Sequence, residues 1–165
     1  MLRSVVQATL RRELLTLRRS IEAYPDDASL WAERPGIPNT GGTLALHLAG
    51  NLQHFVGAVL GKTGYVRDRA AEFARRNVPR TAILAELDAA IEAVDRGLAA
   101  VRDEMLTAEY PLEVAGRKVA IGDFLVHLAT HTAYHLGQFD YHRRVVTGDN
   151  RGVNAVSIVE LPVRG

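Results

Sequence analysis

The sequence has no cysteine among its 165 residues. The protein therefore cannot form a disulfide, supply a thiolate to zinc or to an iron–sulfur cluster, or use a protein thiol as a nucleophile. Any metal ion that it binds must be held by nitrogen and oxygen atoms.

Neither an excess of one charge nor a long hydrophobic run is present. The 20 basic and 19 acidic side chains are interspersed and give a formal net charge of +1, which argues against a nucleic-acid or polybasic membrane surface. No segment approaches the roughly 20 consecutive apolar residues of a membrane helix, and Met1–Ser4 lack the apolar run of a signal peptide. The arginine-rich residues 3–19 have the composition of a mitochondrial presequence, but their apolar residues follow one helical face, which favours the first helix of a bundle. We expect neither nucleic acid nor membrane as a partner.

Several catalytic motifs are missing as well. The chain has no Glu-x-x-His, which argues against a di-iron carboxylate bundle, and no His-Glu-x-x-His, which excludes the zincin motif. It also lacks a phosphate-binding loop with its lysine and a Gly-x-Ser-x-Gly nucleophile elbow. Any chemistry must therefore come from another set of side chains.

Helical periodicity accounts for most of the pattern that is present. Apolar residues recur every three or four positions over residues 2–23, 42–60, 79–105 and 123–146. We expect Thr40 or Thr43 to cap the second of these helices and Asp123 to cap the fourth. Residues 65–79 are highly charged and show no clear pattern.

The segment between the third and fourth helices differs from the rest. Tyr110–Ile121 has the pattern of a β-hairpin, since Gly116 can adopt a positive φ in a turn between two short apolar runs. A further short strand is expected at Val156–Val159. Length and composition, with 47% apolar residues, predict a single globular domain over residues 1–165. Four amphipathic helices without a run of alternating strands predict that it is all-α, a four-helix bundle with this small hairpin inserted.

The histidines are concentrated on two of the predicted helices. They are His47 and His54 on the second helix, and His127, His131, His135 and His142 on the fourth. Side chains four residues apart on a helix have Cβ atoms about 5–6 Å apart, so their imidazoles can converge on one ion. The pairs 127/131 and 131/135 both have this spacing, and His47 is the candidate third ligand from the facing helix.

Three imidazoles without a fourth protein ligand would leave a coordination position open to water or substrate, as in catalytic metal sites. The alternative is that these histidines are hydrogen-bonded packing residues, because a pair four residues apart also occurs by chance. Spacing assigns no metal role to His54 or His142, which we expect to line a pocket or lie at the surface.

Two segments carry a family resemblance. Residues 125–138, LVHLATHTAYHLGQ, contain His-x-x-x-His followed by Leu-Gly-Gln, and residues 45–49, ALHLA, surround His47. Together with RDRAAEF at 67–73 and VPR at 78–80, they resemble the DinB/YfiT-like metalloenzyme family. That family has a His-x-x-x-His with x-Gly-Gln on its last core helix and a third histidine on its second helix.

The resemblance implies that His47, His131 and His135 are the metal ligands and that Gln138 lies near the site. It also implies a divalent ion, zinc or nickel above all, in a cytoplasmic helical bundle that often forms a homodimer. Some members are transferases or isomerases that use a low-molecular-weight thiol. Members often have arginine before the glycine, whereas this chain has Leu136, which puts a role of that arginine in doubt here.

Two functions follow as hypotheses. In the first, the ion activates a small thiol or a water for transfer to, or hydrolysis of, a small electrophilic molecule. The candidate substrate-binding residues are Asn51, His54, Tyr134, Gln138 and Trp31. In the second, the protein is a non-catalytic metal-binding or stress-related helical bundle. No catalytic residue is identified, since Asp123 is expected to be a helix cap and Asp140 to project away from the histidines.

Overall fold

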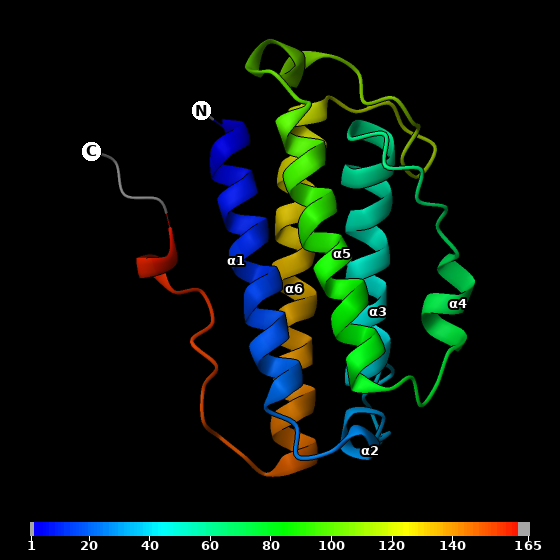
Figure 1. The fold of residues 1–165 in the computed structure, drawn as a ribbon, viewed down its shortest axis with the longest axis vertical. Helices are drawn as coiled ribbons and strands as arrows, with labels where there is room; N and C mark the ends of the chain where they lie inside the picture. Colours follow the sequence, from blue (N-terminus) through cyan, green and yellow to red (C-terminus); the bar gives the residue numbers. More distant parts are fainter. Residues whose placement is uncertain (1, 162–165) are drawn as a thin grey trace.

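The computed structural model describes residues 2–161, and it consists of helices joined by loops (Figure 1). Four long helices run side by side: α1 (Leu2–Glu22), α3 (Gly41–Leu52), α5 (Arg80–Ala99) and α6 (Ile121–Thr147). The shorter elements are α2 (Asp27–Leu30), α4 (Arg69–Ala74), the π-helix η1 (Gln53–Leu60), and the 3₁₀ helices η2 (Asp103–Thr107) and η3 (Ile158–Glu160). No β-strand occurs within the described residues, so the all-α prediction is confirmed. No helix of residues 2–161 is long and apolar enough to cross a membrane.

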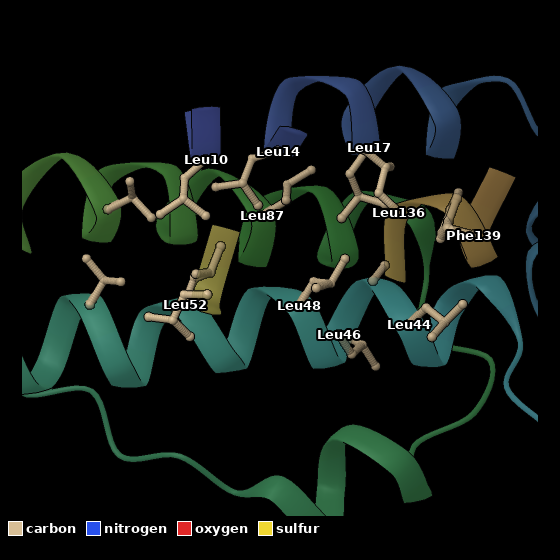
Figure 2. Close-up of a cluster of buried hydrophobic side chains, with 14 of the residues drawn as sticks. Leu10, Leu14, Leu17, Leu44, Leu46, Leu48, Leu52, Leu87, Leu136 and Phe139 are labelled. Atoms are coloured by element: carbon tan, nitrogen blue, oxygen red, sulfur yellow. The ribbon is translucent and has the colours of Figure 1, made fainter. Parts of the chain in front are cut away.

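The apolar core lies between the long helices. On α1, the predicted helical stripe is buried, and Leu10, Leu14 and Leu17 are fully inaccessible. Figure 2 shows these three leucines pointing into the same space as Leu87 of α5 and Leu48 of α3. Burial of such a stripe is the main source of stability for an amphipathic helix.

Helix α3 is the most enclosed element, because all of its 12 residues are buried. It packs against α5 and α6 on the core side and against α4 on the other. Of the two candidate caps, Thr40 is the N-cap, and its side chain accepts a hydrogen bond from the Thr43 N–H at 3.2 Å. A helix that is apolar nearly all round is expected in the interior, and His47 is therefore removed from water.

The predicted helix over residues 42–60 is continuous, but it changes type at Gln53, where the π-helix η1 begins. The π-helix η1 packs against the end of α5 at Gly97. A Cβ at Gly97 would overlap the backbone carbonyl of Val56, and a Cβ at Gly61 would come within 2.9 Å of the Gly97 backbone. The close approach of these two segments thus depends on glycine.

Two predicted helix ends differ from the structure. The third helix stops at Ala99, and Met105, which continues the apolar spacing, lies in η2 instead. The prediction that Asp123 caps the fourth helix is wrong, because Ala120 occupies the N-cap position and makes no side-chain hydrogen bond. Asp123 lies in the first turn of α6, where its negative charge is favourable next to the positive end of the helix dipole.

The two predicted β segments form no strands within residues 2–161. Tyr110–Ile121 and its flank make the isolated antiparallel bridges Glu109–Ala120 and Val114–Arg117, around a turn in which Ala115 and Gly116 have φ of 51° and 71°. The strand predicted at Val156–Val159 is wrong, because Val156 has a φ of 54° and η3 begins two residues later. The single domain over residues 1–165 stays a prediction.

Candidate metal centre

Three histidines from two helices lie close together. His47 comes from α3, and His131 and His135 come from neighbouring turns of α6; one nitrogen of each lies within 4.8 Å of the others. The Nε2 atoms of His47 and His131 are 3.4 Å apart. Two nitrogens bound at about 2.05 Å to a tetrahedral ion are separated by about 3.3 Å, so this distance matches that between two ligands of one ion.

His47 is held from behind by a buried ion pair. Its Nδ1–H donates to Glu72 Oε2 at 3.0 Å, and Arg67 donates to both oxygens of that carboxylate, from Nε at 2.7 Å and from Nη2 at 2.8 Å. A carboxylate in this position accepts from Nδ1–H and orients the ring of His47, so that its Nε2 faces the histidines of α6.

The sequence makes room for this carboxylate. Glu72 is 2% exposed, and a Cβ at Gly50 of α3 would overlap its side chain. Burial alone would raise the pKa of Glu72, but the hydrogen bonds from His47 and Arg67 outweigh burial and hold the pKa below its usual value. Glu72 is therefore ionised at neutral pH and balances the charge of Arg67.

The two histidines of α6 are also in the form that binds metals. His135 Nδ1–H donates to Gln138 Oε1 at 2.7 Å, which leaves Nε2 free. Burial, and then the proximity of His135 and His47, lowers the pKa of His131 to about 4, and burial lowers that of His135. Both imidazoles are neutral at pH 7, as metal ligation requires. His131 Nδ1 is buried and has no hydrogen-bond partner in the described part of the chain.

The remaining histidines lie outside the cluster. His127 is exposed and stacks on Phe124 at 5.7 Å between ring centroids, so α6 presents His135 rather than His127 to His47. His142 is buried rather than at the surface: it accepts from Tyr24 Oη at 2.6 Å and donates to Ala32 O at 2.8 Å.

The candidate substrate-binding residues are distributed unevenly around the cluster. Gln138 contacts His135 directly, and the Tyr134 ring, which is 65% exposed, lies 5.3 Å from the His135 ring. Asn51 is one turn after His47 on α3; it is buried, and its Oδ1 has no partner within residues 2–161. His54 lies a further turn along and is half-buried.

Trp31 has a packing role. Its indole N–H donates to the Val78 carbonyl at 3.1 Å, and its ring covers Gly42 at the start of α3. The side chains that sequence reasoning missed are Arg67 and Glu72. Two features of the sequence could have indicated them. One is the family-like stretch at 67–73, and the other is Asp68, whose side chain accepts from the Ala71 N–H and caps α4.

The donor set fits a borderline divalent ion. Three imidazoles and no thiolate suit zinc, nickel, copper or ferrous iron. Three protein ligands leave a coordination position open, and the outer nitrogens of His47 and His135 already have the hydrogen-bond partners that oriented ligands need.

Comparison with known proteins gives one finding. The family model described as DinB superfamily matches residues 9–139, more than half of the chain and all three histidines of the cluster. No curated protein and no solved structure gives a significant match.

Proposed function

The chain belongs to the DinB superfamily, and from this premise we propose that it is a metal-dependent enzyme. His47, His131 and His135 would hold a divalent ion, zinc or nickel, beside which a low-molecular-weight thiol or a water would be activated. The thiol sulfur would then bond to an electrophilic carbon of a small molecule as the leaving group departs with the bonding electron pair, or the water would hydrolyse that molecule. The four long helices form the four-helix bundle expected of the family.

The observation that carries this proposal is that the ligand set is formed in advance. His47 is oriented by Glu72 at 3.0 Å and His135 by Gln138 at 2.7 Å, so Nδ1 of each ring is engaged and Nε2 remains for an ion. Hydrogen-bonded outer partners of this kind are typical of histidines that bind metal. Histidines that serve only as packing residues do not need outer hydrogen-bond partners that turn their rings toward one shared point.

The chemistry divides between the ion and the chain. A bound divalent ion deprotonates a coordinated thiol or lowers the pKa of a bound water to near 7. The chain supplies no thiol of its own, since it has no cysteine. Its residues orient the ligands and keep the imidazoles of His131 and His135 neutral at pH 7. They also offer the buried Oδ1 of Asn51, unpaired within the described residues, as an acceptor for a donor group of the bound molecule.

Elemental analysis of the purified protein tests the proposal. We expect near-stoichiometric zinc or nickel in the wild type and its loss in His47→Ala and His135→Ala. His127→Ala is the matched control, because it removes an exposed histidine from the same helix and should retain the metal. A wild type that contains no metal and takes none up on titration would overturn the proposal.

A non-catalytic metal-binding protein is the second candidate. The apolar core includes side chains from all four long helices and none of the histidines, so the metal-free protein is expected to fold in either case. Thiol conjugation and hydrolysis assays with the zinc-loaded protein separate the two functions. Activity that His135→Ala abolishes supports the enzyme, and metal binding without turnover over a panel of thiols and electrophiles supports the second candidate.

A further inference from the structure

A cleft of about 210 Å³ adjoins the metal centre, between α6 and the loop that leads into α3. Ile37, Pro38 and Leu44 form one side, and Gln138 and Tyr141 of α6 form the other. Gln138 connects the cleft to the centre, because its Oε1 accepts the hydrogen bond from His135 Nδ1. Leu44 lies one turn before His47 on the same helix.

The loop wall of the cleft is preformed. The Ile37 N–H donates to the Arg34 carbonyl at 3.0 Å, and the two residues between them are Pro35 and Gly36, with a φ of 78° at Gly36. Proline followed by glycine with positive φ is the preferred sequence of a type II turn. Because this turn fixes the position of Ile37, a ligand would not have to order the loop on binding.

The lining determines which chemistry fits. No charged side chain lines the cleft within residues 2–161. Both nitrogens of His142, at its inner end, are already bonded to Tyr24 and Ala32. The Gln138 oxygen is occupied by His135, so its amide N–H groups remain as donors. The adjacent cleft on the other side of the loop is different, since Glu33, Arg34 and Arg76 line it.

The volume limits the size of the ligand. An apolar cavity of about 150 Å³ binds benzene, so about 210 Å³ takes one such ring with a short substituent. Whole drug-sized ligands need roughly 300 Å³ or more. The cleft is therefore large enough for one part of a small molecule.

We propose that this cleft binds the uncharged, apolar part of the electrophilic substrate, a group of about the size of a benzene ring that carries a hydrogen-bond acceptor for Gln138. The reactive end of the substrate then lies on the His135 side of Gln138. This inference rests on the proposed function, and it makes Ile37 and Gln138 the residues that select the substrate.

Nuclear magnetic resonance titration tests the cleft with three probes that share a benzene ring and carry a short substituent: neutral N-methylbenzamide, anionic benzoate and cationic benzylammonium. We expect N-methylbenzamide to shift the backbone amide signals of Ile37, Asn39 and Gln138 with a millimolar Kd, and the two ions to bind at least about tenfold more weakly. Ile37→Ala should weaken binding of the neutral probe about fivefold to tenfold, through lost apolar contact. Ile91→Ala, at a half-buried position of α5, is the matched control and should leave the Kd unchanged.

Equal affinity for all three probes, shifts confined to other regions, or a Kd that Ile37→Ala does not change would overturn the cleft as a substrate site. The titration is run on metal-free and zinc-loaded protein, so that the two proposals can fail separately. Zinc uptake without probe binding overturns the cleft alone, whereas probe binding in a protein that takes up no zinc supports the cleft and overturns the proposed function.

Discussion

Glu72→Gln tests whether the carboxylate behind His47 controls metal affinity. Glutamine keeps the size of the side chain but removes its charge, so the guanidinium of Arg67 loses its partner at 2.7 Å and repels an incoming cation. A hydrogen bond to a charged group contributes about 1.5–3 kcal/mol, and removing the outer partner of a metal-bound histidine lowers metal affinity about 10–100-fold. We expect the zinc Kd to rise by about that factor. The metal-free protein should lose about 2–4 kcal/mol of its free energy of unfolding, because the Arg67 side chain is only 10% exposed.

Competition with a chromophoric chelator measures the zinc Kd, and the d–d absorption of the cobalt-substituted protein reports the coordination geometry. The matched control is Glu86→Gln, which breaks an ion pair with Arg75 at 2.8 Å whose side chains are 30% and 38% exposed. Such an exposed pair contributes at most about 1 kcal/mol, and the zinc Kd should not change. A folded Glu72→Gln protein that binds zinc within twofold of the wild type would refute the reasoning.

Four further substitutions test the packing of the helices and the pH dependence of stability. Gly50→Ala keeps every polar group but displaces the buried carboxylate, and it should weaken zinc binding in the same chelator assay; unchanged affinity would show that the carboxylate can shift freely. In urea unfolding, Gly97→Ala should lose about 1–3 kcal/mol through overlap with a backbone carbonyl. Gly137→Ala, which has open space around its Cβ within the described residues, should gain about 0.5–1 kcal/mol, and equal effects would contradict this account. Burial lowers the pKa of His142 below 6.5. Near and below pH 6.5, His142 therefore binds more protons in the unfolded chain than in the folded one, and the free energy of unfolding decreases as the pH is lowered. His142→Gln retains both hydrogen bonds without titrating and should reduce the stability loss between pH 7 and pH 5, whereas an unchanged loss would assign it to other groups.

Helical spacing could predict the cluster because two of its three members are four residues apart on one helix. Spacing could not choose between His127 and His135, since both pair equally well with His131. That choice depends on how α6 is rotated against α3, which is a tertiary property. In the structure His127 faces solvent and His135 faces His47.

Arg67 and Glu72 could not be placed from periodicity. Helix α4 has only 6 residues, fewer than two turns, and a segment that short shows no apolar stripe. Its position against α3 is set by contacts distant in the sequence, namely the carboxylate over Gly50 and the hydrogen bond to His47. The close approach of Gly97 to the π-helix η1 could not be predicted from periodicity either, because it joins segments that are distant in the sequence.

The side chains that stabilise the fold are different from those that form the histidine cluster. The buried leucines of α1, such as Leu14, pack with those of the other long helices, and α1 contributes nothing to the histidine cluster. A chain of 165 residues buries about 70% of its unfolded surface, so its core does not need an ion to close, unlike the core of a small zinc domain. We therefore expect chelator-treated protein to keep its helical circular dichroism spectrum, with zinc at 100 times its Kd adding about 2.7 kcal/mol to stability. Collapse of the helical signal on metal removal would show instead that the ion is structural, and loss of activity in the histidine variants would then report unfolding rather than chemistry.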